Sequence, residues 1–482
     1  MANLVIVESP GKVKKVSSIL GDGWKVAASV GHVRDLPQNS LGVDAPNYRP
    51  SYELTERGRE VIAKLRKLVA EADQVYLCTD PDREGEAIAW HLQQTLGLKA
   101  PRRAVFRDIN PGPVRAGIAN PRQIDMDLVA AQEARRVLDR LVGYLVSPRL
   151  SALAGSKLTA GRVQTPAVRL VVDRERAIAA FKVTNHFGVR LKFAGGAWSA
   201  EWNVKAAFPV APHFCLDEAV ARAAASKRSV TVEAFADSEA RRSPPAPLTT
   251  SKLQQVASTR LRLKPAAVME AAQKLYEAGL ITYHRTDSPN LAADGFATLK
   301  AYAAGAGLET VAEQRTWKAK GNAQEAHEAI RPSHFEDVIA GATEIERSVY
   351  KLIRDAALAS QMPDARYAVR AATLKAPRAG APQGFDLYEA KGRTLLAPGW
   401  LALGAAGDDD AEEEDKGESA NNAVPALQIG DTVTVTAADL VRRKTEPPKR
   451  YTEADLVKAL ETEGIGRPST YAAIMEKIAG HG

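Results

Sequence analysis

The segment LITYHRTDSPNL, residues 280–291, surrounds one tyrosine with groups that can form hydrogen bonds. An apolar run ends at Tyr283, and a histidine, an arginine, a threonine, an aspartate and a serine follow it directly. A tyrosine in a protein core needs one partner for its hydroxyl. The segment therefore marks Tyr283 as a tyrosine whose surroundings require another explanation.

A second segment, TDPDREGEAIAWHL from Thr79, places Asp80, Asp82 and Glu84 at alternate positions after an apolar run. Alternate side chains of an extended chain point the same way, so the three carboxylates are expected to converge and to repel one another unless a cation lies among them. Hard oxygen ligands suit Mg²⁺. The simpler interpretation is that these acids form the first turn of a helix, where its dipole favours them. Three alternating acids favour the metal site.

Glu8 also follows an apolar run, Leu4 to Val7, and joins the acidic cluster if the two strands are neighbours. Lys12 lies four residues further on, in ESPGK. This is not a phosphate-binding P-loop, because the first glycine of that motif is missing and Val13 follows the lysine. The sequence implies no ATP, and on its own Lys12 would be taken for a surface lysine.

These groups need elements to position them. Short apolar runs predict strands at Leu4–Val7, Lys25–Val30 and Val75–Cys78, and a helix is expected over Gly85–Leu96. Strands that alternate with helices predict a mainly parallel sheet, and the carboxyl ends of such strands are where open α/β sheets place their sites. We interpret roughly the first 118 residues as one α/β domain.

Beyond this domain the pattern changes several times. A helix is predicted over Ala130–Val146, with Arg135 and Asp139 four residues apart and able to pair. Residues 183–237 alternate like antiparallel strands, and Tyr367–Leu374 and Ile429–Val435 repeat that pattern. The chain ends in helical sequence around Ala472–Ile478.

Helix signals also precede the tyrosine. A proline-rich linker begins at Ser243, and Ser251 with Gln254 fits a capping box. The next helix is expected to begin near Pro265 and to end at Gly279, so that Tyr283 lies just past a helix end. The acidic segment from Gly407, GDDDAEEEDKGESANN, is expected to be a solvated, disordered loop without function.

Bulk composition limits the possible functions. The 482 residues are enough for three or four domains, and with 45% hydrophobic and 26% charged residues the chain has the composition of a soluble globular protein. The net charge of +7 suits a polyanion such as nucleic acid but also an ordinary basic protein. Two distant cysteines, Cys78 and Cys215, argue against a disulfide framework or a cysteine-rich zinc site. The N-terminus has neither a signal peptide nor a membrane span, so a cytoplasmic location is expected.

Seven segments occur in the order in which type IA DNA topoisomerases carry them, and they most resemble those of the bacterial members of that family. They are VIVESPGK, SVGHVRDLP, TDPDREGEAIAWHL, LTAGRVQTPAVRLVV, ITYHRTDS, EAHEAIRPS and GIGRPSTYA. Together they span nearly the whole chain. The resemblance implies a multi-domain α/β plus α fold: an N-terminal Toprim domain with a parallel sheet, then a core of helical and antiparallel β domains around a DNA-sized hole.

The resemblance also implies a division of the chain into six parts. Residues 1–118 would form a Toprim domain, and residues 242–365 a helical domain that carries the tyrosine. A helical DNA-binding domain would begin with residues 119–182 and continue, incompletely, with residues 448–482. A β-rich arch would consist of residues 183–241 and residues 366–447.

The implied chemistry uses Tyr283 as a nucleophile that attacks a DNA phosphodiester and holds the 5′ end of one strand as a phosphotyrosine. A second strand would pass through the gap before the 3′ hydroxyl reseals the break, without ATP, and negative supercoils would relax. A phenol with a pKa near 10 needs activation for this attack. Arg285 would hold the scissile phosphate with its planar fork, Lys12 would protonate the leaving 3′ oxygen, and Glu8 would lie beside it as a proton relay or a phosphate-positioning acid.

Further roles follow from the same resemblance. His327 would position the phosphate, although a lone histidine is more often structural. Mg²⁺ would be held by the acidic residues Glu8, Asp80, Asp82 and Glu84. Single-stranded DNA would be contacted by three segments, which contribute Arg135, Arg136 and Asp139, then Arg162 and Gln164, then Arg467, Ser469 and Thr470. Each of these arginines could instead form an ion pair on a solvated face. The expected partner is single-stranded or negatively supercoiled DNA, with no nucleotide, no membrane and a monomeric protein.

Some features depart from the family pattern or leave alternatives open. The sequence stops at Gly482, before the rest of the helical domain and the C-terminal repeats of relatives, so a fragment, an engineered core or a short natural form is expected. RDINPGPV, from Arg107, stands where relatives often show E-I-T. Tyr471, a rival nucleophile by residue type, lies in a helical context and is interpreted as structural. The alternatives are a non-catalytic single-strand-binding fragment and another Toprim enzyme, such as a primase or a nuclease.

Overall fold

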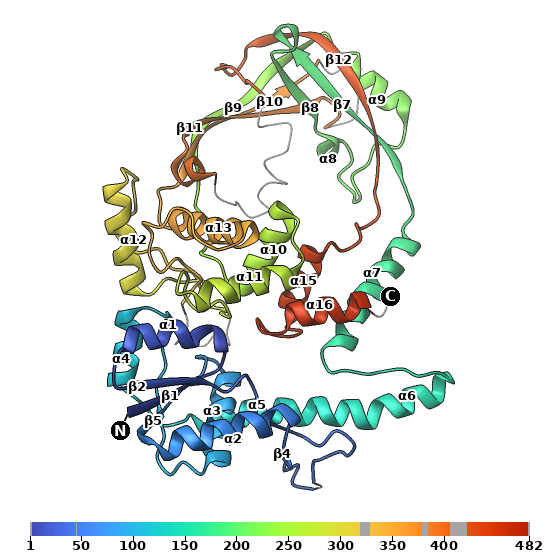
Figure 1. The fold of residues 1–482 in the computed structure, drawn as a ribbon. Helices are drawn as coiled ribbons and strands as arrows, with labels where there is room; N and C mark the ends of the chain where they lie inside the picture. Colours follow the sequence, from blue (N-terminus) through green and yellow to red (C-terminus); the bar gives the residue numbers. More distant parts are fainter. Residues whose placement is uncertain (1, 45, 319–327, 378–383, 405–421, 481–482) are drawn as a thin grey trace.

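The structure, a computed structural model, describes residues 2–44, 46–318, 328–377, 384–404 and 422–480. An N-terminal α/β unit lies at one end and a β-barrel at the other, with the helices around the tyrosine between them on one side (Figure 1). Helices α7, α15 and α16 lie on the other side, close to the end of the chain (Figure 1). His327 and residues 407–421 of the acidic segment lie outside the described residues.

The N-terminal unit is built on a four-stranded parallel sheet in the order β2-β1-β5-β6. Its strands are β1 (Ala2–Val7), β2 (Trp24–Ala28), β5 (Ala72–Cys78) and β6 (Arg102–Arg103), and its helices are α1 (Pro10–Leu20), α2 (Glu56–Ala70), α3 (Arg83–Leu96) and α4 (Pro111–Ala119). Leu4 and Ile6 face one core together with residues of α2 and α3, whereas Val5 and Val7 face the core that includes α1 and α4. The predicted parallel α/β domain is confirmed. A short separate pair, β3 (Arg34–Asp35) with β4 (Glu53–Leu54), is antiparallel.

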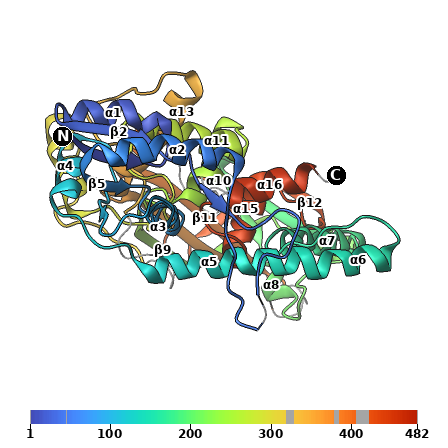
Figure 2. The same ribbon diagram turned by 60° about the horizontal axis from the view of Figure 1, so that its bottom comes forward.

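A long helical arm follows. Helix α5 (Met126–Leu141) continues through a π-helical turn (Val142–Val146) into α6 (Ser147–Ala154), and Figure 2 shows the two helices in one line that begins beside α3. Helix α7 (Gln164–Ala180) then turns away. Asp139 accepts a hydrogen bond from Arg162 at 2.9 Å, because the segment before α7 returns to α5, and the charge of Asp139 also acts on Arg135.

The barrel is closed, in the order β10-β11-β8-β7-β12-β9. Its strands are β7 (Asn185–Phe193), β8 (Trp198–Trp202), β9 (Ser229–Arg242), β10 (Ala365–Lys375), β11 (Leu387–Ala397) and β12 (Thr432–Lys444), and its short helices are α8 (Val204–Ala207) and α9 (Glu218–Ala225). The pairings between these strands are antiparallel, as predicted, and the strands come from two distant parts of the chain. Phe193, Trp202 and Tyr388 lie in its core.

Between the barrel and the N-terminal unit lie the helices that carry the tyrosine segment. They are α10 (Thr250–Leu261), α11 (Pro265–Glu277), α12 (Ala293–Gly305) and α13 (Glu344–Ser360). Helix α11 begins and ends as predicted, with Gly279 beyond it at a φ of 71°. The predicted Ser251–Gln254 cap was wrong, since the N-cap is Thr249, whose hydroxyl accepts from the Lys252 amide.

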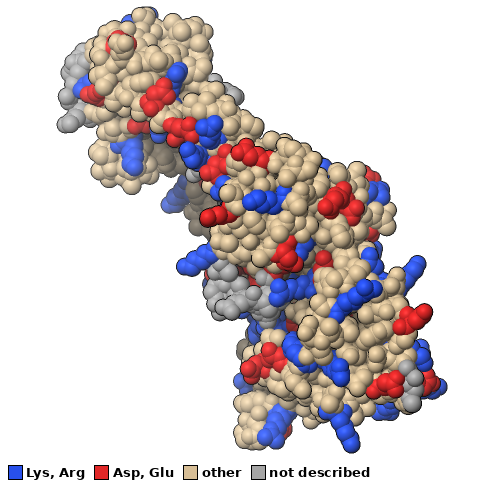
Figure 3. All heavy atoms as spheres, turned by 90° about the vertical axis from the view of Figure 1, so that its left-hand side faces the viewer, with Lys and Arg blue, Asp and Glu red and all other residues tan. Residues whose placement is uncertain are grey.

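The end of the chain returns to the helical arm. Helices α15 (Glu453–Thr462) and α16 (Tyr471–Gly480) form a small core with α7, in which Tyr471 is buried, consistent with its structural interpretation. None of the helices in the described part of the chain is both long enough and apolar enough to cross a membrane. On the face shown in Figure 3, acidic and basic side chains are interspersed, so the net charge does not collect there as one basic field.

Candidate active site

The carboxyl ends of β1 and β5 bring the first acidic groups together. These strands are parallel neighbours, with Val7 opposite Cys78, so Glu8 and Asp80 leave the sheet side by side. Glu8 Oε2 accepts a hydrogen bond from the Asp80 amide at 3.4 Å. Lys12 reaches the same point from α1, where its ammonium group pairs with the Asp80 carboxylate, and both side chains are buried. Lys12 is therefore not a surface lysine.

The chain after Asp80 is folded tightly against the start of α3. The Thr79 hydroxyl donates to the Gly85 carbonyl at 2.6 Å, and a Cβ at Gly85 would overlap the backbone of Asp80. Asp82 is the N-cap of α3, and its Oδ1 accepts from the Gly85 amide at 2.8 Å. Asp82 thus fills the helix-capping role of the simpler interpretation, and its second oxygen remains available to another element.

Tyr283 supplies that element from a different unit of the fold. Its phenol donates to Asp82 Oδ2 at 2.8 Å, and its backbone amide donates to the carbonyl of Arg107 at 2.8 Å. The tyrosine is only 4% exposed. The tyrosine that the sequence singled out and the acidic turn that it predicted therefore form one site.

Arg285, two residues after Tyr283, lies beside the same acids. Its Nη1 is 3.6 Å from Glu84 Oε2 and 4.0 Å from Asp82 Oδ2. On the other side, His32 Nε2 lies 3.7 Å from Glu84 Oε1. No role was predicted for His32, although it lies in SVGHVRDLP, one of the segments that carry the family resemblance.

The electrostatics of the site keep the phenol protonated. Burial raises the pKa of Tyr283 well above its usual value, and the charges of Asp82 and Asp80 raise it further. Burial lowers the pKa of Arg285, but its anionic neighbours raise it to a net value above the usual range, so the guanidinium stays charged. Burial and the neighbouring Asp80 raise the pKa of Glu8 to about 8, against the opposing effect of Lys12. Glu8 can therefore carry a proton at neutral pH.

A further aromatic ring completes the centre. Tyr276, on α11, contacts both Lys12 and Tyr283: its ring centroid is 4.9 Å from Lys12 Nζ and 5.2 Å from the ring centroid of Tyr283. A cation over an aromatic face is stabilised electrostatically. Sequence analysis missed Tyr276, because at helical spacing it cannot be distinguished from a core residue.

The acidic residues fit a magnesium site in kind, because their oxygens are the ligands that Mg²⁺ prefers. Among the described residues, however, no three histidine, cysteine or acidic side chains gather in a way that could hold a metal ion. Asp80 pairs with Lys12, Asp82 accepts from Tyr283, and Glu84 faces His32 and Arg285. In this arrangement each of the three carboxylates already faces a cationic, imidazole or phenol group. A metal ion would have to replace some of these contacts.

The three segments expected to contact DNA come together beside this centre. A hollow of about 250 Å³ opens on Asp82, Glu84 and Arg285 and is also lined by Arg135, Arg467, Ser469 and Thr470. A second hollow of about 720 Å³ is lined by Arg136, Asp139, Arg162 and Gln164, and Thr470 lines both. Residues more than 300 positions apart in the chain thus form one continuous surface.

Three of the predicted DNA contacts, Arg136, Arg162 and Asp139, are engaged in ion pairs. Arg136 forms a two-pronged pair with Asp35 at 2.8 and 2.6 Å, and Arg162 pairs with Asp139. Arg135 lines the smaller hollow, beside Asp82 and Glu84. Burial, and after it the charge of Arg162, lowers the pKa of Arg135. Arg83, Gln132 and Asp287 also line that hollow and were not predicted, because no spacing in the sequence sets them apart.

Comparisons with known proteins agree with this geometry. A sequence model of the family described as DNA topoisomerase matches residues 123–482, and one of the Toprim domain matches residues 3–109. The chain is 54% identical to "DNA topoisomerase I, plasmid" of Xylella fastidiosa (strain 9a5c), over 99% of this chain and 73% of that protein. It is 40% identical to "DNA topoisomerase 1" of Streptomyces coelicolor, over 99% of this chain and 55% of the relative.

A solved structure gives the same result. Full-length topoisomerase I from Thermotoga maritima superposes with a TM-score of 0.84 at 32% identity, over 99% of this chain and 78% of that one. The chain therefore spans between about half and four fifths of the length of these relatives. Matches over nearly the whole chain, together with a tyrosine held against the acidic turn of a Toprim sheet, show that the chain belongs to the type IA DNA topoisomerase family.

Proposed function

We propose that this protein breaks, passes and rejoins single DNA strands through a 5′-phosphotyrosine at Tyr283, without ATP, and so relaxes negative supercoils. The observation that carries the proposal is the 2.8 Å hydrogen bond from the Tyr283 phenol to Asp82. It holds the proposed nucleophile against Asp82, its proton acceptor, and Asp82 lines one hollow together with the cation Arg285.

In the cleavage step, the phenol oxygen of Tyr283 attacks the scissile phosphorus and the bond from phosphorus to the 3′ oxygen breaks. The phenolic proton passes to the Asp82 carboxylate, with which it is already hydrogen-bonded. The leaving 3′ oxygen takes a proton from the Lys12 ammonium group, which pairs with Asp80, and Glu8 lies beside them as a proton relay or a phosphate-positioning acid. Rejoining is the reverse, so the ester conserves the energy of the broken bond.

Arg285 is proposed to hold the scissile phosphate. A phosphate in transfer spreads negative charge over its oxygens, and a fixed guanidinium stabilises that charge. The proximity of Arg285 to Asp82 and Glu84 supports this role, because the anions keep the cation at the mouth of the hollow. His327 remains a proposed phosphate-positioning residue.

Mg²⁺ is the proposed cofactor, held by Asp80, Asp82 and Glu84 with Glu8 beside them. The match to the Toprim domain and the all-carboxylate set support it. When bound, the ion would neutralise the acids and the DNA phosphates near them. The chain's own cations, Lys12 and Arg285, fill part of this role in the structure described here.

Single-stranded DNA is the proposed substrate along the two hollows. The convergence of Arg135, Arg162 and Arg467 with hydroxyl and amide side chains supports phosphate contacts, which give affinity and salt dependence rather than sequence choice. The proposed six-part domain division is supported by a barrel built from two segments and by helices α15 and α16, which pack on α7. A monomer in the cytoplasm that binds no nucleotide remains a prediction.

A covalent trapping assay tests the function. A single-stranded oligonucleotide with a 3′ label is mixed with the protein, with and without Mg²⁺, and the reaction is stopped with detergent and alkali. Label that migrates with the protein reports the 5′-phosphotyrosine. Tyr283→Phe should abolish this label and leave DNA binding intact, whereas Tyr471→Phe should keep it.

The same assay separates the alternatives. Binding without any adduct at all Mg²⁺ concentrations would indicate a non-catalytic single-strand-binding fragment. Net cleavage with a free 5′ phosphate would indicate a different Toprim chemistry. An adduct that persists in the Tyr283→Phe protein would sink the assignment of the nucleophile.

A further inference from the structure

The reacting groups lie on two units of the fold. Glu8, Lys12 and Asp82 belong to the N-terminal unit (β1 to α4), whereas Tyr283 belongs to the tyrosine unit (α10 to α13 with the segments 279–291 and 328–335). During cleavage the two units must hold the phenol against the acidic turn. For a strand to pass, the same units must separate. The residues that join them should therefore affect both events.

One short segment of the N-terminal unit, residues 107–110, lies along the tyrosine segment. The carbonyl of Arg107 accepts from the Tyr283 amide at 2.8 Å, and Asn110 Nδ2 donates to the Gly279 carbonyl at 3.1 Å. These two contacts hold the first part of the tyrosine segment, at Gly279 and at Tyr283. Asn110 is buried, so water does not compete for its bond.

Asp108, in the middle of this segment, contacts a second segment of the tyrosine unit, residues 328–335. Its Oδ1 accepts from the Ser333 hydroxyl at 2.9 Å, and both residues are buried. The Ser333 amide in turn donates to the Leu280 carbonyl at 2.9 Å, beside a bridge between Ile281 and Pro332. The Asp108 carboxylate is therefore connected to the tyrosine segment through one hydrogen bond and one backbone pairing.

The backbones approach closely at the joint. Gly279 has a φ of 71°, and a Cβ there would lie 2.5 Å from the carbonyl oxygen of Ile109. Glycine is thus required both by the left-handed conformation and by the space available. This fit leaves the tyrosine segment little freedom to slide along the N-terminal unit.

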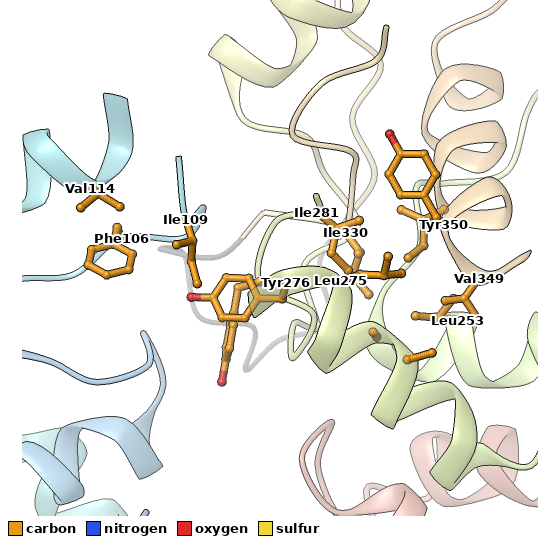
Figure 4. Close-up of a cluster of buried hydrophobic side chains, with 14 of the residues drawn as sticks. Phe106, Ile109, Val114, Leu253, Leu275, Tyr276, Ile281, Ile330, Val349 and Tyr350 are labelled. Atoms are coloured by element: carbon orange, nitrogen blue, oxygen red, sulfur yellow. The ribbon is translucent and has the colours of Figure 1, made fainter. Parts of the chain in front are cut away.

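The apolar packing at the joint is continuous but gives little direction. Figure 4 shows Ile109 between Phe106 and Val114 of the N-terminal unit and Tyr276 of the tyrosine unit, and all four belong to one buried cluster. Apolar contact is non-directional, so it holds the units together without fixing their register. The directional bonds of Asp108 and Asn110 supply that register.

We propose that Asp108 and Asn110 are positioning residues that dock the tyrosine segment in its cleavage register, and that breaking their bonds accompanies separation of the two units. The proposal rests on the proposed function. It also gives a role to RDIN, the segment that departs from the E-I-T pattern of relatives, because its acid and its amide make the two side-chain bonds.

The test compares variants that remove one bond from opposite sides. In Asp108→Ala and Ser333→Ala, rejoining of a preformed covalent adduct, started by added salt, should slow by about tenfold, the effect expected for one hydrogen bond to a charged group. The double variant should be no slower than Asp108→Ala, because loss of the carboxylate already breaks the Ser333 bond, together with the bond that Asp108 accepts from Asn110. Binding of the uncleaved oligonucleotide should not change.

Two further variants separate positioning from folding. Asp108→Asn retains an acceptor for Ser333 and should restore most of the rejoining rate. Asn120→Ala, at the end of α4, removes a side-chain amide that donates to the Ala116 carbonyl of the same helix at 3.0 Å. This variant should rejoin the adduct at the rate of the unaltered protein. Each variant's unfolding midpoint is measured alongside, and Ser333→Ala, the smallest change, is the one on which the conclusion depends.

If the unaltered protein forms the adduct and Ser333→Ala rejoins it at the same rate, the positioning role is overturned while the proposed function stands. Additive effects in the double variant would also overturn it, because the two side chains would then act separately. If the unaltered protein forms no adduct, the proposed function fails first, and the positioning role fails with it.

Discussion

Burial of the Tyr283 phenol against a carboxylate makes the resting site unreactive. Burial is the main cause that places the pKa of Tyr283 well above its usual value, and the phenolate would also be a third negative charge beside Asp82 and Asp80. The phenol instead donates its proton, and Arg285 remains charged next to it. Compensation of the two aspartates by a cation would lower the cost of ionisation, so a metal ion bound at these acids would help to activate the nucleophile.

His91 gives a pH prediction at the scale of one residue. It is buried on α3, where its Nδ1 accepts from Arg34 Nε at 2.8 Å, and burial together with Arg34 and His32 lowers its pKa to about 3. In the unfolded chain histidine titrates near 6.5. As the pH falls from 6.5 towards 3, only the unfolded chain takes up the proton, so stability is lost, by about 1.4 kcal/mol at one pH unit below 6.5.

Hydrogen exchange of the α3 amides, corrected for intrinsic rates, measures this loss between pH 7.5 and pH 5.5. His91→Gln keeps a neutral acceptor for Arg34 and should show a smaller loss over the same range by about that amount. An equal loss in both proteins would mean that His91 is not the residue that titrates on unfolding.

At the scale of the elements, local patterns predicted what local physics determines. Buried runs placed β1 and β5, and the acids after β5 were correctly expected near the start of a helix, where Asp82 became its cap. The cap of α10 was missed because Thr249, Thr250 and Ser251 are all good caps. The choice is made by distant residues: the Thr250 hydroxyl donates to the carbonyls of His284 and Thr286, at 2.7 and 3.0 Å.

The partners of the individual carboxylates could not be predicted from residue spacing either, because they too are set by distant parts of the chain. Alternation predicted that the carboxylates would need positive charge, and the resemblance supplied Arg285 and Lys12 as residues of the site. Their pairing with particular carboxylates depends on how α1 and the tyrosine segment pack on the sheet, and so does the contact of His32. Residues that meet across two units leave no periodic signal in the sequence.

Arg103, on β6, gives a prediction about how an element is held. Its side chain is 0% exposed and donates to the carbonyls of Leu77, Thr79 and Asp80 at 2.8 to 3.1 Å, and it pairs with buried Glu86 at 3.0 Å. Arg103→Met would leave these carbonyls and a buried carboxylate short of a partner. We expect it to destabilise the N-terminal unit by roughly 3–5 kcal/mol, the usual cost of breaking a buried ion pair.

Denaturant unfolding followed on the N-terminal unit measures this cost. Arg102→Met is the matched control, because Arg102 is exposed on the same strand and donates to the hydroxyl of Tyr76. Arg103→Met combined with Glu86→Leu should cost less than the sum of the two single changes, because both break the same ion pair; the pair of Glu86 with Arg122 is lost only where Glu86 is changed. If the two single arginine variants cost the same, the buried network does not hold the turn.

At the scale of the whole molecule, the substrate surface exists only because the chain returns on itself. Arg467 lies more than 300 residues after Arg135, yet both line the hollow beside Asp82, because α15 and α16 pack on α7. No local feature of either segment predicts this convergence, and only the ordered resemblance to a family indicated it. The joint surface has a measurable consequence, because each arginine that contacts a phosphate adds to the salt dependence of binding.

For a single strand, one phosphate contact contributes about 0.7 to the slope of log affinity against log salt concentration. Arg467→Gln should therefore weaken binding of a labelled single-stranded oligonucleotide and reduce that slope by about 0.7, as measured by anisotropy between 50 and 200 mM salt, roughly the range over which such contacts are resolved. Arg450→Gln is the control, since Arg450 is an exposed arginine of the same C-terminal part that pairs with Glu175 at 2.7 Å, away from both hollows. Equal slopes for the two variants would mean that the returning C-terminal helices complete the fold without contributing to the substrate surface.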